Sequence, residues 1–221
     1  MKPKDNLELW YIFYMKMYLS AYELGNETEK LKALIPENNK VGYIFNALDF
    51  TGTDPERKAK RVKKNMDELN ELGFDCVDLD LKKYYGKASE LKKLVGAFGT
   101  IWVSGGNTFV LRQAFKLSGF DNILLDLNKQ ENFLYGAYSA GVCVLSPTLD
   151  AYKIVDDATD TPFEGIDETV WEGLSIIDYT FLPHYDSDHP ESDLVGKTLE
   201  YCKEQGLRYK TLRDGEVIIS E

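Results

Sequence analysis

Apolar runs alternate with amphipathic segments along most of the chain. Each run is short and bounded by polar turn residues, and the segments between them repeat apolar residues at helical spacing. This alternation is typical of a three-layer α/β protein, with a mostly parallel sheet covered by helices on both faces. The expected strands are residues 16–22, 40–48, 74–81, 100–106, 132–138 and 179–185, and the expected helices are 28–35, 54–73, 88–98, one from about Asn107, 121–130 and 191–206.

Turn and capping residues set the boundaries of several elements. Asp54 and Pro55 fit the N-cap and first position of the helix 54–73, and Gly73 fits its end. The stretch 147–173 is rich in turn formers and acids, so we expect long loops with one short strand there. RYKTLRDGEVIIS (208–220) reads as a terminal hairpin that turns at Asp214–Gly215.

The length of 221 residues and a hydrophobic content of 43% are ordinary for one globular domain. We therefore expect a single domain over residues 1–221. A first strand that begins near Met15 would leave residues 1–14 as an N-terminal extension or as residues ahead of the natural start, and the sequence does not choose between the two. The oligomeric state is not addressed by the sequence.

Charge and cysteine content narrow the partners and the compartment. A net charge of −11 and a pI near 4.8, without a basic stripe, argue against a nucleic-acid partner. No apolar run reaches the roughly 20 residues that span a bilayer, so no membrane partner is expected. The three cysteines are odd in number and far apart, which predicts reduced thiols in the cytoplasm. They also lack metal-ligand spacing, so we expect neither a metal nor another cofactor.

Ser139 follows an apolar strand in GAYSAGVCVLSP (136–147) and is a candidate nucleophile. A nucleophile elbow needs small neighbours because its serine lies on a strained turn. Ala140 and Gly141 follow Ser139, but Ala137 stands where G-x-S-x-G has its first glycine. The motif alone therefore leaves two interpretations open, a catalytic serine and an N-cap residue at the start of a helix.

A serine nucleophile needs a general base, for which imidazole is the usual group. The chain has two histidines: His184 ends the expected strand 179–185, and His189 lies in the polar loop that follows. We expect His184 to be the base, because its strand end falls at the sheet edge where Ser139 is expected. His189 is expected to be solvated, with contact to the substrate as the alternative. The acid that orients the base is expected at Asp214, although Asp-Gly is also a common turn signal, and Asp186, Asp188 and Glu191 are alternatives.

SGGNTF (104–109) follows the expected strand 100–106 and exposes a backbone without side chains. The N–H groups of Gly106 and Ala140 are candidates for an oxyanion hole, which stabilises the charge that develops on an attacked carbonyl. A phosphate-binding turn is the alternative, but the stretch has neither G-x-G-x-x-G spacing nor a P-loop lysine.

Four stretches in this order, WVSGGNTFVLRQAF, YGAYSAGVCVLSP, FLPHY and RDGEVI, resemble the aspartyl dipeptidase (dipeptidase E) family of serine peptidases, whose wider group includes cyanophycinase. The likeness extends from about Met15 to residue 221. It implies a Rossmann-like fold akin to class I glutamine amidotransferases, with serine in place of their cysteine. It also implies Ser139 as nucleophile, His184 as base, Asp214 as the acid, and Gly106 and Ala140 at the oxyanion. Gly105, Asn107 and Asp150 are implied at the substrate.

The segment after His184, DSDHPESDLVGK, departs from the resemblance because it is acidic and lacks the arginine that helps aspartyl dipeptidases to read their substrate. The expected function is therefore a serine peptidase that hydrolyses dipeptides or short peptides through an acyl-enzyme, with preference for an N-terminal aspartate left open. An esterase or amidase with the same Ser–His site, and a non-catalytic ligand-binding module of amidotransferase-like fold, are the alternatives.

Overall fold

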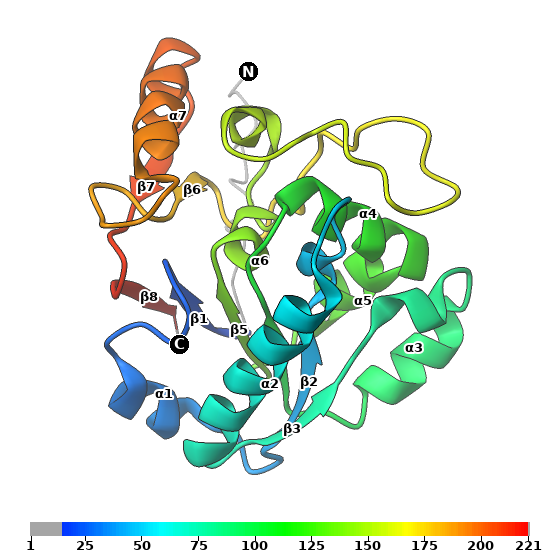
Figure 1. The fold of residues 1–221 in the computed structure, drawn as a ribbon. Coiled ribbons are helices and arrows are strands. Elements are labelled where there is room, and N and C mark those ends of the chain that lie inside the picture. The colour runs from blue at the N-terminus through cyan, green and yellow to red at the C-terminus, as the bar shows by residue number, and fades with distance from the viewer. Residues whose placement is uncertain (1–14, 221) are drawn as a thin grey trace, which may run out of the picture.

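A six-stranded sheet forms the centre of the computed structural model, which describes residues 15–220 (Figure 1). The order of strands is β3-β2-β4-β5-β1-β8, and only β8 runs antiparallel to its neighbour. Its strands are β1 (Lys16–Ser20), β2 (Lys40–Ile44), β3 (Asp75–Asp78), β4 (Thr100–Val103), β5 (Leu134–Tyr138) and β8 (Val217–Ser220). Residues 1–14, which we expected to be a possible N-terminal extension of the single domain, lie outside the described residues.

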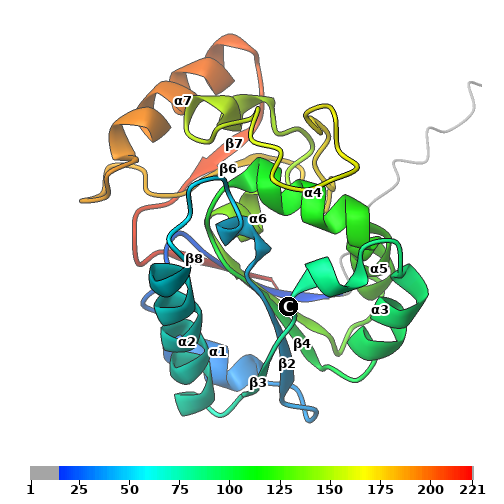
Figure 2. The same ribbon diagram turned by 45° about the vertical axis from the view of Figure 1, so that its right-hand side comes forward.

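Helices cover both faces of the sheet, as expected (Figure 2). One face packs against α1 (Thr28–Leu34) and α2 (Pro55–Glu71), and the other against α3 (Ala88–Val95), α4 (Thr108–Ser118) and α5 (Phe120–Leu127). Strand residues alternate between the two cores: Trp102 packs with α1 and α2, whereas its neighbours Ile101 and Val103 pack with the other helices. The three-layer α/β fold is therefore confirmed.

The start and end of α2 follow the expected local chemistry. Asp54 accepts hydrogen bonds from the N–H groups of Glu56 and Arg57, at 2.8 and 3.1 Å, and Pro55 occupies the first helical position. The chain leaves the helix at Gly73, whose φ of 109° suits a residue without a Cβ. The sequence therefore defines this element well.

The prediction of a C-terminal hairpin is wrong, although the predicted turn is present. β7 (Tyr209–Thr211) pairs in parallel with β6 (Thr180–Leu182) as a separate two-stranded sheet, while β8 pairs with β1. Asp214 and Gly215 lie in a turn that is closed by Glu216 N–H donating to Arg213 O at 3.0 Å. The turn thus joins two sheets instead of two paired strands.

Two further segments differ from expectation. The strand expected over 40–48 ends at Ile44, and a 3₁₀ helix, η1 (Asn46–Leu48), follows it. The region 147–173 contains no full strand but one isolated bridge between Thr148 and Glu172 and a 3₁₀ helix, η3 (Asp150–Ile154). The remaining helices are η2 (Leu81–Tyr84), α6 (Ala140–Cys143) and α7 (Ser192–Glu204). Within the described part of the chain, no helix combines the length and apolarity needed to cross a membrane.

Candidate active site

Ser139 lies on a sharp turn between β5 and α6, at the carboxyl end of a central strand. Its φ of 50° and ψ of −120° are strained for a residue with a side chain, at a cost of about 1–3 kcal/mol. A Cβ on Gly105 would lie 2.9 Å from Ser139 Cβ, and one on Gly141 would lie 2.6 Å from Val103 O. The small neighbours of the serine are therefore required by close packing.

The position of Ser139 answers the question of N-cap or elbow. It occupies the N-cap position of α6, but its side chain makes no capping hydrogen bond. Its Oγ lies instead 3.3 Å from His184 Nε2. The strained backbone thus directs the hydroxyl toward an imidazole and away from the helix.

His184 connects Ser139 to Asp214. Its Nδ1 lies 2.6 Å from Asp214 Oδ1, while its Nε2 faces the serine. With Nδ1 protonated, the ring donates a hydrogen bond to the carboxylate and leaves Nε2 free to accept the serine proton. The structure therefore brings together the three residues expected to form a catalytic triad.

The small sheet β6–β7 holds the histidine and the acid side by side. Leu182 is opposite Thr211 in the register, and Leu212 N–H donates to Leu182 O at 2.9 Å. His184 and Asp214 follow these paired positions by two and three residues. The N–H of Asp214 also donates to Ser187 Oγ at 2.8 Å, which fixes the turn.

Burial makes His184 a weak base in this site. The residue is 1% exposed, and this burial lowers the pKa of its imidazole below the ordinary 6.5, although the hydrogen bond to Asp214 acts in the opposite direction. The imidazole is consequently neutral at pH 7, the form in which it can accept a proton.

Gly106 and Ala140 each present a backbone N–H next to Ser139. Gly106 has a φ of 147°, and a Cβ there would lie 2.3 Å from Ala47 O, so only glycine fits. Neither N–H donates a hydrogen bond to any residue in the range 15–220. Both N–H groups therefore remain candidates for the oxyanion hole.

A cleft of about 640 Å³ opens onto Ser139 and His184. Asn107 lines it, and the same side chain caps α4 by accepting from Phe109 N–H at 2.8 Å and donates to Asp157 O at 3.0 Å. Gly105 packs behind the serine. The other lining residues are Tyr22, Phe50, Thr51, Arg61, Gly106, Val155, Asp156, Asp157, Asp160, His189 and Glu191.

The structure does not bring Asp150 to this cleft. Its carboxylate binds Lys153 at 2.8 Å and the hydroxyl of Tyr201, so η3 is tied to α7. Asp156, which the sequence reading missed, lines the cleft instead and accepts from Thr108 N–H at 2.9 Å. Burial of its carboxyl raises the pKa to about 7. The acid-rich stretch DDATD (156–160) was the available signal.

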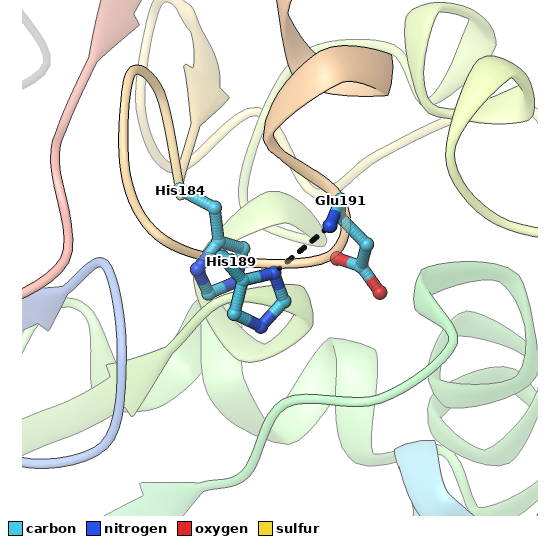
Figure 3. A group of neighbouring side chains, drawn as sticks. All are labelled: His184, His189 and Glu191. Atoms are coloured by element: carbon cyan, nitrogen blue, oxygen red, sulfur yellow. Dashed lines mark hydrogen bonds between the residues drawn. The ribbon is translucent and has the colours of Figure 1, made fainter.

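His189 is half-buried and lines the cleft, where the alternative expectation of contact with the substrate places it. Its ring stacks on that of His184, with centroids 3.7 Å apart and planes 10° apart (Figure 3). The N–H of Glu191 donates to His189 Nδ1 at 3.2 Å. Tyr22 packs edge-on against both imidazoles, at 5.7 and 5.6 Å. The stack therefore restrains the ring of His184.

His184, His189 and Glu191 place potential metal-ligand atoms within 4.8 Å of one another. The two stacked rings point their nitrogen lone pairs along nearly parallel planes, whereas one Zn²⁺ needs them to converge at about 2.0–2.1 Å. His189 Nδ1 is also occupied by the N–H of Glu191. This arrangement supports the orientation of His184 better than it supports chelation.

Cys143 lies one helical turn beyond Ser139 and is buried, as expected of a core residue. Burial also raises the pKa of its thiol well above the usual value, which makes it a poor nucleophile. Ser139 is consequently the better nucleophile at this end of the sheet.

Comparisons with known proteins agree with the fold and identify a family. The model of peptidase family S51 matches residues 26–221. The uncharacterized peptidase Lmo0363 of Listeria monocytogenes is 36% identical over 165 residues, covering 72% of this chain and 77% of its own. The uncharacterized peptidase PM1590 of Pasteurella multocida is 32% identical over 151 residues, or 62% and 70% of the two chains.

Two crystal structures share the fold. A peptidase E protein from Listeria monocytogenes superposes with a TM-score of 0.70 at 21% identity and covers 94% of this chain and 98% of its own. A peptidase from an acI-B1 Actinobacterium gives a TM-score of 0.67 at 18% identity, with 94% and 84% coverage. The resemblance to the dipeptidase E family is confirmed by the family match: the chain belongs to peptidase family S51 and is a serine peptidase.

Proposed function

We propose that this peptidase hydrolyses dipeptides or short peptides through an acyl-enzyme formed on Ser139. The observation that carries the proposal is the continuous set of contacts from Ser139 Oγ to His184 Nε2, at 3.3 Å, and from His184 Nδ1 to Asp214 Oδ1, at 2.6 Å. Nucleophile, base and orienting acid are the parts that acyl transfer needs.

In the first half of the reaction, Ser139 Oγ attacks the peptide carbonyl while its proton moves to His184 Nε2. The N–H groups of Gly106 and Ala140 donate to the oxyanion. The tetrahedral intermediate then expels the amine, which takes the proton from His184, and the acyl group remains on Ser139. Water attacks this ester with His184 again as base, and the acid is released.

The lining of the cleft bears on the choice of substrate. Four carboxylates line it, those of Asp156, Asp157, Asp160 and Glu191, against a single arginine, Arg61. Gly105 and Asn107 belong to the loop after β4, which we place against the substrate. Asp150 has no role in the proposal. An N-terminal aspartate, which the dipeptidase E resemblance implies, is supported by Arg61 and opposed by the acids. We therefore propose short peptides in general as the substrate class.

The free thiols support a proposal for the compartment. Cys76, Cys143 and Cys202 form no disulfide within the described residues. Unpaired thiols, two of them buried, are typical of a reducing environment. We propose the cytoplasm as the place where the enzyme meets its peptides.

The test is hydrolysis of a dipeptide panel, with and without N-terminal Asp, by the wild-type protein and Ser139→Ala. We expect wild-type turnover and a loss of roughly 10⁶-fold in the variant, the size seen when a triad serine is removed. Ser89→Ala, an exposed residue of α3, is the matched control and keeps full activity.

Other outcomes separate the alternatives. Cleavage of p-nitrophenyl esters or simple amides without cleavage of peptides would identify an esterase or amidase that uses the same serine. A wild-type protein that cleaves nothing and does not react with a fluorophosphonate would contradict catalysis and favour a ligand-binding module.

A further inference from the structure

Arg61 is an isolated cation in the candidate active-site cleft. Among the described residues that line the cleft, it is the only arginine or lysine. Within residues 15–220 it forms no ion pair with an aspartate or glutamate, although the chain carries 37 acids. No carboxylate of the described residues therefore neutralises this guanidinium, and a ligand carboxylate can do so.

Aromatic residues hold Arg61 beside the nucleophile. It projects from α2, and its guanidinium carbon lies 5.8 Å from the ring centroid of Tyr138, the residue that precedes Ser139. Burial by itself would lower the pKa of Arg61, but the neighbouring hydroxyls of Tyr138 and Tyr22 raise it instead. The side chain is therefore fully charged, and its surroundings are phenolic and not anionic.

We propose that Arg61 binds a carboxylate of the substrate. A guanidinium matches a carboxylate in shape and charge, and it can donate two parallel hydrogen bonds to it. In a dipeptide the C-terminal carboxylate lies one residue beyond the scissile bond, within about 4 Å in Cα spacing, so a cation in the same cleft as Ser139 is within reach. This proposal rests on the proposed function and names the group by which the cleft recognises its substrate.

The acids of the cleft complement this assignment. Asp156, Asp157 and Asp160 follow η3, and Glu191 follows His189, so these carboxylates come from segments other than α2. A dipeptide carries an ammonium group at one end and a carboxylate at the other. A cleft with a cation on one segment and acidic side chains on others fits such a zwitterion better than it fits the interior of a long peptide.

The carboxylate has two sources, the C-terminus of the leaving residue and the side chain of an N-terminal aspartate. Binding to the Ser139→Ala protein, measured by calorimetry, separates them without need of turnover. One pair of ligands is Ala-Phe and its C-terminal amide, and the other is Asp-Phe and Asn-Phe. We expect loss of the recognised carboxylate to weaken binding on the order of 10- to 100-fold, as for other hydrogen bonds to charged groups. The pair that shows this loss identifies the source.

Variants of Arg61 in the same background decide the proposal. Arg61→Gln should abolish the difference within the sensitive pair, and Arg61→Lys should retain part of it, because the charge remains without the planar fork. Arg57→Gln is the matched control: Arg57 is exposed, lies one turn earlier on α2 and does not line the cleft. It should leave the difference intact.

Three results would overturn the assignment: discrimination that persists in Arg61→Gln, equal binding of both members of both pairs, or no binding of any dipeptide. Circular dichroism and the unfolding temperature of each variant verify that the fold is retained. Failure of the proposed function is a separate result, since it is measured as absence of hydrolysis by the wild-type protein whatever the Ser139→Ala protein binds.

Discussion

His184 receives opposing influences from its neighbours. Burial and the charge of His189 lower its pKa, whereas Asp214 and Glu191 raise it. Ser139 faces it from the elbow, and Tyr22 faces it from the segment after β1. Because burial is the largest influence, the imidazole loses its proton below pH 6.5 and stays an acceptor in mildly acidic solution.

The acidic limb of the pH profile tests this balance. We expect kcat/KM to fall only below pH 6.5, as His184 takes up a proton. The substitution His189→Phe keeps a flat ring for stacking but removes the imidazole that, through its charge, lowers the pKa of His184. His189→Phe should therefore raise the pKa of His184 and move the acidic limb to higher pH. A limb that stays in place, with activity retained, would contradict this electrostatic role.

In the proposed triad, Asp214 fixes the tautomer of the histidine through its contact with Nδ1. Asp214→Asn preserves the size of the side chain but not its charge, so Nδ1 no longer holds the proton reliably. We expect kcat to fall by roughly 10⁴-fold, the loss known for this change in a serine protease triad. Asp188→Asn, an exposed neighbour in the loop after His184, is the control and should have little effect. A loss below tenfold in Asp214→Asn would contradict the assignment.

The sequence indicated the residues next to the chemistry better than those that line the cleft. Ser139 and Gly106 stand in motifs because a strained elbow and a close backbone approach tolerate few residue types. Arg61 has no such local signature: it is one cation on a helix rich in lysine, and only the fold turns it inward. The stacking of His189 on His184 was not predicted, because a polar loop indicates average exposure and not the contacts of one ring.

Among the helices, α2 depends visibly on its N-cap. Asp54→Ala removes the acceptor for two backbone N–H groups, and we expect the free energy of unfolding to fall by about 1 kcal/mol. Asp67→Ala on the same helix removes only an exposed pair with Lys63 and should cost a few tenths of that. Denaturant titration of both variants measures the difference, and equal losses would contradict the capping argument.

Strand pairing separates what local sequence can predict from what it cannot. The parallel strands β1, β2, β4 and β5 were expected because their buried runs are mostly apolar. The pairing of β7 and β8 was not expected, because Asp214–Gly215 indicates a turn but does not specify the partner of each flanking strand. β7 joins β6 and β8 joins β1, and both choices depend on contacts far apart in the sequence.

At the scale of the whole molecule, the carboxyl of Asp156 lowers the free energy of unfolding at neutral pH. Asp156 has a folded-state pKa of about 7 against an ordinary 3.8, so between these values the folded state binds more protons than the unfolded state. Its contribution to stability is accordingly lost as pH rises from 3.8 to 7. Each pKa unit corresponds to about 1.4 kcal/mol, which sets an upper limit of about 4 kcal/mol.

Asp156→Asn tests this linkage. The amide keeps an oxygen for Thr108 N–H and has no charge to bury. We expect the variant to unfold at higher denaturant concentration than the wild type at pH 8, and the gain to disappear below pH 4. Asp157→Asn is the control, since the hydrogen bonds from Thr159 lower the pKa of that carboxyl and no gain is expected. A gain that is constant with pH would contradict the linkage.

The order of the site residues along the chain has a consequence for biosynthesis. Ser139 precedes His184, and Asp214 comes last, in the turn between β7 and β8. A chain growing on the ribosome therefore carries its serine long before the pairing of β6 with β7 can bring imidazole and carboxylate together. In the proposed mechanism, Ser139 therefore has neither its base nor its acid until the segments that carry β6 and β7 have been made and have paired.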